Sequence, residues 1–344
     1  MKRFIFHIVS CAALALSAVA CMDYGPSEAE PFDLQQRGLF VTCEGNFCYG
    51  NASLSLYIPS ERRVENELFI RANGMNLGDV AQSIALHNAL AYIVVNNSGV
   101  VYVVDTRTFE VQRTITGLTS PRYIHFVDDK KAYITDLYDP HIAVVDLQNH
   151  RITRRISTNG HRSTEQMVQY GRYIFTNCWS NDHKILVVDS QTDALVDSIE
   201  VGRQPSSLAL DRHNKLWTIT DGAELYRIDA ATRTVEQVFH FERGTFAARL
   251  ALNGTRDTLY YINGAVWRMP VVADHLPYVP FLAENGTIYY GLTVDPVTSE
   301  VYVADAIDYV QPGMIYRFTP DGTEVDRFRV GITPGAFCFK PQNP

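Results

Sequence analysis

Short runs of β-branched and aromatic residues, each followed by a polar turn, recur through this chain and constrain its fold more than any other feature. Val, Ile, Tyr and Thr favour a pleated, half-buried surface, whereas Asp, Asn, Pro and Lys between the runs favour turns. The stretch from Gly117 to Ile156 holds four such runs: Arg122–Phe126, Ala132–Thr135, Ile142–Val145 and Ile152–Ile156. We predict a four-stranded antiparallel meander there. A sheet this small cannot bury both of its faces alone, so several copies must stack.

The same pattern returns on both sides of this stretch. Its second run, Ala132–Asp136, has counterparts at Ala91–Val95, Tyr173–Asn177, Leu216–Thr220, Leu259–Asn263 and Val301–Asp305. The spacing, roughly 40 to 50 residues, is typical of β-propeller blades. A β-sandwich would not repeat so regularly, a parallel β-helix has shorter repeats, and a βαβ fold needs helical patterns that this sequence lacks.

The two ends of the repeating region complete each other. Residues 38–70 supply only three predicted strands, Leu39–Thr42, Leu54–Ile58 and Glu67–Ile70, and Ile332–Phe339 matches the first strand of a copy. Joined, they give one composite blade beside six complete copies. We therefore predict an all-β fold, a seven-bladed β-propeller over residues 37–344. A one-plus-three strand closure of blade one leaves no free sheet edge.

The beginning of the chain has a different pattern. Lys2 and Arg3 precede an apolar run, Phe4–Leu16, and small residues lead to Cys21. This order is typical of a secretory signal peptide, here residues 1–20, and the cysteine directly after it is typical of a bacterial lipoprotein. We predict lipidation at Cys21 and a lipidated tether over residues 21–36, which would hold the protein on a membrane. The alternative is a soluble exported protein in which this cysteine is incidental.

Composition and charge exclude several classes of protein. Of 344 residues, 46% are hydrophobic and 20% are charged, which is ordinary for a soluble globular chain and argues against disorder or a membrane bundle. The formal net charge is −8 and no basic tract occurs, so a nucleic-acid partner is not expected.

Four cysteines lie beyond the export segment: Cys43, Cys48, Cys178 and Cys338. Cys43 and Cys48 flank one short loop, and an exported protein can oxidise such a pair. Unpaired thiols in a β core are an equally good interpretation, and the disulfide stays open at this point. The spacing does not form a paired CxxC metal motif.

Comparison of the blades separates scaffold from candidate site. Inner strands of a propeller begin beside the central channel, so equivalent positions that differ between blades are candidates for ligand contact. One ring of such positions holds Gln82, Arg122, Glu165, Ser206, Ala248, Tyr290 and Gly335. The next ring holds Ser83, Tyr123, Gln166, Ser207, Arg249, Gly291 and Ala336. The mixture of donors, acceptors and charges would suit an irregular polar ligand, although such groups also satisfy backbone and neighbouring blades.

The loops on the same face add aromatic and amide side chains. Aromatic residues in loops on a rigid scaffold are candidates for binding flat or amphipathic ligands. Together with the rings they give the predicted ligand-binding set: Asn46, Tyr49, Gln82, Asn97, Arg122, Tyr123, Tyr138, Glu165, Trp179, Arg249 and Tyr290.

Catalytic and metal chemistry is less well supported. His141, His161 and His183, with Asp139, Asp182 and Glu165, fall on adjacent blades and would make a metal or acid–base cluster if they met. Exposed loop histidines are commoner, and no HExxH, GxSxG, P-loop or CxxCH motif occurs. Asp or Asn also ends the second strand of most blades, where capping a turn is a commoner role than binding calcium. We therefore predict no catalytic residues, no metal ligands and no cofactor.

Several segments together resemble a known family. Thr116–Ile124, Thr135–Tyr138, Thr164–Met167, Val201–Leu208 and Glu44–Asn46 look like the corresponding parts of YncE-like, surface-layer-type propeller lipoproteins of gut Gram-negative bacteria. Within that family the chain is similar to the BtuG group, which captures cobalamin at the cell surface. The resemblance implies a lipid-anchored outer-membrane protein facing the exterior. It also implies a corrinoid ligand that is passed to a TonB-dependent outer-membrane transporter.

Two other functions stay open. Tyr and Trp platforms would equally serve a surface module that binds glycans or proteins. Seven-bladed lyases with similar repeats exist, so a metal-dependent lyase or hydrolase is the enzymatic alternative, and it predicts bound metal beside His141, His161 and His183.

Overall fold

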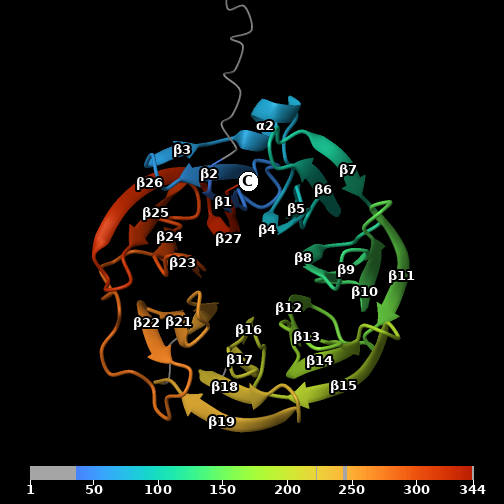
Figure 1. Ribbon diagram of the computed structural model, residues 1–344, viewed down its shortest axis with the longest axis vertical. Helices are drawn as coiled ribbons and strands as arrows, with labels where there is room; N and C mark the ends of the chain where they lie inside the picture. Colours follow the sequence, from blue (N-terminus) through green and yellow to red (C-terminus); the bar gives the residue numbers. More distant parts are fainter. Residues whose placement is uncertain (1–35, 222, 243–245, 343–344) are drawn as a thin grey trace, which may run out of the picture. The chain divides into compact units, whose positions relative to one another are not determined.

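The computed structural model describes residues 36–221, 223–242 and 246–342, and these form a seven-bladed β-propeller, with one sheet in each blade (Figure 1). The predicted signal peptide, Cys21 and most of the predicted tether lie outside the described residues. No helix among the described residues is long and apolar enough to cross a membrane.

Blade one joins both ends of this region, in the order β27-β1-β2-β3. Its strands are β1 (Gly38–Cys43), β2 (Ser53–Ile58), β3 (Arg63–Glu65) and β27 (Pro334–Lys340). The innermost strand, β27, pairs antiparallel with β1, so that Gly38 lies opposite Lys340 and Phe40 opposite Cys338. This confirms the predicted one-plus-three closure (Figure 1).

The next four blades follow one another along the chain, each with four antiparallel strands. Blade two is β4 (Ala81–His87), β5 (Leu90–Val95), β6 (Val100–Asp105) and β7 (Val111–Ile115). Blade three is β8 (Pro121–Phe126), β9 (Lys131–Asp136), β10 (His141–Asp146) and β11 (Arg151–Ser157). Blade four is β12 (Thr164–Tyr170), β13 (Tyr173–Cys178), β14 (Lys184–Asp189) and β15 (Ala194–Glu200). Blade five is β16 (Ser207–Leu210), β17 (Lys215–Thr220), β18 (Glu224–Asp229) and β19 (Thr234–His240).

Blade six departs from the predicted pattern. It has only three described strands, β20 (Ala248–Leu252), β21 (Thr258–Asn263) and β22 (Ala265–Pro270), so the expectation of six complete copies is wrong for this blade. Pro277 and Pro280 follow β22, where an outer strand would form, and proline cannot donate to a ladder. Blade seven is complete, with β23 (Tyr289–Val294), β24 (Val301–Asp305), β25 (Pro312–Phe318) and β26 (Glu324–Ile332).

Blade one also corrects a predicted element. The strand after β2 is β3, at Arg63–Glu65. The predicted strand Glu67–Ile70 is wrong, because Leu68–Ile70 form the first turn of a short helix, α2 (Leu68–Asn73). Glu67 has a φ of 57°, a left-handed conformation that ends an extended run. Leu68 and Phe69 are buried, and the Phe69 ring lies 4.8 Å from that of Tyr102, so the apolar residues pack as a helical turn.

The core lies between blades, as stacking of small sheets requires. Middle strands such as β9 and β13 are buried along most of their length, whereas outer strands such as β11 are largely exposed. One buried cluster joins Tyr92 and Val94 of blade two to Ile134 and Val145 of blade three. Each blade therefore covers the face of its neighbour, which holds the inner strands around one axis.

Candidate ligand-binding site at the propeller channel

Register irregularities place the predicted ring residues at the channel. In six of the seven described sheets, the pairing of the innermost strand shifts by a residue at the ring position. Thus Arg122 and Tyr123 together oppose Thr135, and Glu165 and Gln166 together oppose Asn177. A bulge of this kind bends a strand and redirects its side chains, and bulges are common beside binding sites.

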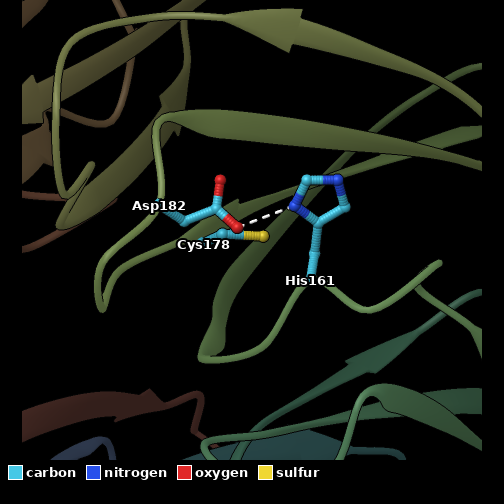
Figure 2. A group of neighbouring side chains, drawn as sticks. All are labelled: His161, Cys178 and Asp182. Atoms are coloured by element: carbon cyan, nitrogen blue, oxygen red, sulfur yellow. Dashed lines mark hydrogen bonds and ion pairs between the residues drawn. The ribbon is translucent and has the colours of Figure 1, made fainter.

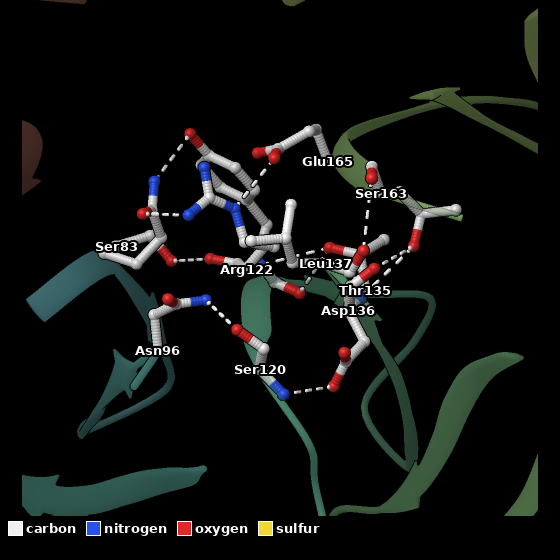
Figure 3. Close-up of polar contacts among 12 residues, drawn as sticks. Ser83, Asn96, Ser120, Arg122, Thr135, Asp136, Leu137, Ser163 and Glu165 are labelled. Atoms are coloured by element: carbon white, nitrogen blue, oxygen red, sulfur yellow. Dashed lines mark hydrogen bonds and ion pairs between the residues drawn. The ribbon is translucent and has the colours of Figure 1, made fainter. Parts of the chain in front are cut away.

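Arg122 and its partners form the first half of the site (Figure 3). Its Nε donates to Glu165 Oε1 at 2.8 Å, and its Nη1 donates to Gln82 Oε1 at 2.5 Å. Ser83 Oγ donates to the Arg122 carbonyl at 2.7 Å, so blade two orients the bulge of blade three. These residues come from the inner strands of blades two, three and four, and their contacts connect three blades around the channel.

Arg249 forms the second half of the site. Its φ of 56° is left-handed, an uncommon and strained conformation for a residue other than glycine, and it accompanies the bulge in β20. Nε donates to the Tyr290 carbonyl at 2.9 Å, and the guanidinium lies 5.0 Å from the centre of the Tyr290 ring. No carboxylate of the described residues lies within 4.0 Å of its nitrogens. The guanidinium therefore keeps hydrogen-bonding capacity for a ligand.

Glu44 faces this second half from blade one. Its Oε1 accepts a hydrogen bond of 2.9 Å from the Tyr290 hydroxyl. Burial raises the pKa of Glu44, and the charges of Arg249 and Arg122 act in the opposite direction. Burial likewise raises the pKa of Glu165, although Arg122 stabilises its ionised form. The site thus combines two arginines with two carboxyl groups that burial makes easier to protonate.

A cavity of about 310 Å³ lies between these two halves. It is lined by Arg122, Tyr123, Glu165, Trp179, Ser206, Ser207, Ala248, Arg249, Tyr289 and Tyr290. Tyr123 and Arg249 also line a second cavity of about 200 Å³, which continues along the inner strands toward Leu292 and Phe337. Both volumes lie near or below the lower end of the range for small-molecule sites, roughly 300–1,000 Å³.

Six residues of the predicted ligand-binding set line the larger cavity: Arg122, Tyr123, Glu165, Trp179, Arg249 and Tyr290. Gln82 supports it from outside, because it accepts from Arg122 and its Nε2 lies 3.4 Å from the Tyr123 hydroxyl. The comparison of equivalent positions in different blades therefore brings together residues that are up to 168 positions apart, Arg122 and Tyr290.

The other four predicted residues lie outside this lining. Tyr49 is 78% exposed and lines a separate cavity of about 200 Å³ beside α2. Asn46 donates to the Tyr309 carbonyl at 2.8 Å, and Asn97 donates to Asp79 Oδ2 at 2.5 Å. Tyr138 is 62% exposed on its loop. The loop amides Asn46 and Asn97 bond residues of other loops, and such contacts are not visible in the repeat pattern.

Sequence reasoning did not include Glu44, Ser206, Ser207, Ala248 and Tyr289 in the predicted ligand-binding set. The sequence did contain a signal by which Glu44 could have been selected. Its backbone N–H bonds Thr333, and the N–H of Trp179 bonds Ser163 in the same way, so both residues follow the second strand of their blades at equivalent positions. Comparison of this position between blades would have added Glu44 beside Trp179.

The Asp and Asn residues that end second strands act as turn caps where the contacts are clearest. Asp136 accepts hydrogen bonds from the backbone N–H groups of Thr119, Ser120, Tyr138 and Asp139 at 2.8–3.0 Å. Figure 3 shows the bond from Ser120. Asn96 donates to Ser120 and to the carbonyl of Pro121. The bonds of Asp136 favour the turn interpretation over a calcium ring, whereas Asn96 connects blade two to blade three.

The three predicted histidines do not form one cluster. His141 Nδ1 lies 2.6 Å from Asp139, His161 Nδ1 lies 2.7 Å from Asp182, and His183 Nε2 lies 3.9 Å from Glu200. Among the described residues, the one group of three or more potential metal ligands is His161, Cys178 and Asp182.

The four cysteines among the described residues are unpaired. Cys43, Cys48, Cys178 and Cys338 are all free, with Cys43 buried and Cys48 exposed, so the disulfide left open by the sequence is absent. Burial raises the pKa of Cys43 to about 12, which makes it an inert core thiol.

Known proteins share the fold of this chain across wide sequence differences. A quinonprotein alcohol dehydrogenase-like protein from Bacteroides thetaiotaomicron superposes with a TM-score of 0.69 at 16% identity, covering 90% of this chain and 79% of that one. Apo AztD from Citrobacter koseri superposes with a TM-score of 0.60 at 10% identity, covering 88% and 98%. Identities this low show the fold alone.

Two comparisons rest on sequence. Antigen Lp49 of Leptospira interrogans is 24% identical over 106 residues, which cover 27% of this chain and 23% of Lp49, so the match spans about a quarter of that protein's length. A family match covers much more of the chain. Over residues 37–329 the sequence matches the family described as a domain of unknown function (DUF5074), and the chain belongs to that family.

Proposed function

We propose that this protein is a non-catalytic, lipid-anchored surface protein that captures a small nutrient ligand at the propeller channel. Cobalamin or another corrinoid is the first candidate ligand, and a TonB-dependent outer-membrane transporter is the partner that would receive it. One observation carries the proposal: the Arg249 guanidinium faces the central cavity, and no carboxylate of the described residues lies within 4.0 Å of its nitrogens.

The chemistry of the cavity supports a ligand with hydrogen-bond acceptors at its edge. Guanidinium N–H groups bind carbonyl and carboxylate oxygens, and burial of the site strengthens such bonds. The edge of a corrinoid ring carries several amides that offer acceptors of this kind. A volume of about 310 Å³ admits such an edge group, while the flat ring would lie across the mouth against Trp179, which is 41% exposed.

The cellular part of the proposal rests on the first residues of the chain. The apolar run Phe4–Leu16 and Cys21 support export and lipidation, and lipid chains of this kind anchor a protein stably to a membrane. A protein held there would meet its ligand before a transporter does. The resemblance to YncE-like propeller lipoproteins is the support for a place at the outer membrane and for transfer of the ligand to a TonB-dependent transporter.

The experiment mixes purified residues 22–344 with cyanocobalamin at micromolar concentration and separates them on a sizing column. We expect the red ligand to travel with the protein. Arg249→Gln should weaken binding by about ten- to a hundredfold, because a hydrogen bond to a charged group contributes about 1.5–3 kcal/mol. Arg327→Gln is the matched control, since Arg327 pairs with Glu324 on the outer strand β26. It should bind as the unchanged protein does.

Absence of co-migration would exclude the corrinoid. A glycan array distinguishes corrinoid capture from the main alternative, a glycan-binding module. Carbohydrate binding that depends on Trp179, in the absence of cobalamin binding, would support the glycan-binding module. Equal binding by Arg249→Gln and the unchanged protein would show that the ligand does not bind in the central cavity.

A further inference from the structure

Three potential metal ligands meet at blade four (Figure 2). His161 lies in the loop between β11 and β12, Cys178 ends β13, and Asp182 lies in the loop between β13 and β14. Their ligand atoms all lie within 4.8 Å of one another. Figure 2 shows the imidazole, the thiol and the carboxylate converging, with a dashed line from His161 Nδ1 to Asp182 at 2.7 Å.

The backbone holds each of the three residues in place. The N–H of His161 bonds the Thr158 carbonyl at 3.2 Å, and the Thr158 hydroxyl bonds the His161 carbonyl in return. Cys178 pairs with Thr164 in the β12–β13 ladder. Asp182 Oδ1 accepts from the His183 N–H at 2.7 Å, which leaves Oδ2 directed toward His161. Ligands fixed in this way need little rearrangement to bind a metal.

The neighbouring blade offers an internal comparison. In blade three, His141 lies 2.6 Å from Asp139, and Arg155 donates to the other carboxylate oxygen at 2.8 Å. That pair therefore already has a permanent cation. Asp182 has no lysine or arginine within 4.0 Å among the described residues, and it has the Cys178 sulfur nearby instead. The surroundings of Asp182 are thus suited to a cation that the protein chain does not supply.

We propose that His161 Nδ1, Cys178 Sγ and Asp182 Oδ2 bind a divalent transition metal of the zinc type, with one coordination position left open. Nitrogen, thiolate and carboxylate donors suit zinc. Bonds of about 2.0 Å to N and O and about 2.3 Å to S place tetrahedral ligand atoms about 3.3–3.6 Å apart. The present separations, 2.7 Å and up to 4.8 Å, bracket those values. One thiolate and one carboxylate also balance the charge of a divalent ion.

A metal in this place would act on the mouth of the channel. Trp179 follows Cys178 directly and lines the central cavity. A metal that joins the end of β13 to both adjacent loops would fix the segment from Cys178 to Asp182. It would therefore hold Trp179 in position, independently of which ligand the cavity binds.

The test titrates the purified full chain with Co²⁺, whose thiolate complexes absorb strongly in the near ultraviolet, and then displaces it with Zn²⁺. We expect one equivalent per chain and a thiolate-to-cobalt band that Zn²⁺ removes. Cys178→Ala should abolish the band, and His161→Gln should weaken binding by at least about tenfold. Elemental analysis after desalting checks the stoichiometry of zinc.

Two matched controls separate this site from adventitious binding. His141→Gln removes the histidine of the comparable pair in blade three, and Cys48→Ser removes an exposed thiol. Both should bind one equivalent with an unchanged band. Circular dichroism checks that each variant folds, and His161→Gln carries the test if Cys178→Ala does not fold, since the His161 side chain is 29% exposed. No binding at micromolar metal, or a band that survives both Cys178→Ala and His161→Gln, would overturn the proposal.

Discussion

Glu44 shows how a single residue couples the site to stability. It is a partly buried carboxyl group beside Arg249, and it accepts a hydrogen bond from Tyr290. Burial disfavours its ionised form, so its pKa is raised in the folded protein. The folded chain therefore binds a proton at Glu44 over a pH range in which the unfolded chain has released it. In that range the free energy of unfolding falls as the pH rises.

Replacement of Glu44 by Gln tests this linkage. Below the unfolded pKa, about 4.3, both side chains are neutral and the two proteins should have similar stability. Above it, Glu44→Gln should be the more stable protein, by an amount that grows until the pH passes the raised pKa. Urea unfolding between about pH 4 and 7 measures the difference.

Glu110→Gln is the control for removal of a carboxylate charge at an exposed position. Lower stability of Glu44→Gln at neutral pH would mean that the ionised carboxylate stabilises the fold through Arg249 more than burial destabilises it.

At the scale of the element, the bulges of the inner strands depend on side chains of the neighbouring strand. The bulge at Arg122 and Tyr123 removes Tyr123 from the ladder between β8 and β9. The hydroxyl of Thr135 replaces the lost partners, because it accepts from the Tyr123 N–H at 3.1 Å and lies 3.3 Å from the Tyr123 carbonyl. Thr135 thus allows β8 to aim Arg122 at the cavity without leaving backbone groups unsatisfied.

We expect Thr135→Val, which keeps the shape and removes the hydroxyl, to lower the free energy of unfolding by about 1–3 kcal/mol, because a buried backbone group loses its partner. Thr218→Val is the matched control. Thr218 is also fully buried, but its hydroxyl has no hydrogen-bond partner among the described residues, so this change should be neutral or stabilising.

Urea unfolding of both variants gives the comparison. Equal effects at the two positions would show that the Thr135 hydroxyl does not support the bulge.

At the scale of the whole propeller, one strand pair closes the ring. In blade one, β27 comes from the far end of the described region, whereas β1, β2 and β3 come from its beginning. The ladder between β27 and β1 joins these two parts of the blade. Leu39 and Val41 of β1 are fully buried in the cluster that includes Tyr302 and Ile315 of blade seven. Removal of β27 would therefore leave an unpaired edge beside a buried core, which favours aggregation.

Truncation after Thr333, which deletes β27, should abolish cooperative unfolding and the monomer peak on a sizing column. The expected loss is comparable with the whole stability of a domain, about 5–15 kcal/mol. Truncation after Lys340 leaves the ladder intact and is the control, for which we expect a monomer with little change in stability. A folded monomer after the longer truncation would show that the clasp is dispensable.

The sequence by itself determined most of the strands, the number of blades and their closure, but not the outer strands of blades one and six. Each blade must bury its two middle strands against its neighbours, so patterns such as Ala132–Asp136 recur and can be counted. Comparison of the blades also selected Arg122, Glu165, Arg249 and Tyr290, which line the central cavity, because scaffold positions repeat from blade to blade and these positions differ.

Only the tertiary structure decided where loop residues lie. Bulges turn Arg122 and Arg249 toward the cavity, and a shift of one residue changes the face that a strand side chain occupies. Tyr49 and Glu44 belong to one loop, yet Glu44 faces the channel and Tyr49 lines another cavity. His161, Cys178 and Asp182 likewise meet because three separate segments are fixed by their own backbone bonds. Such positions follow from packing and hydrogen bonds between blades, which leave no periodic trace in the chain.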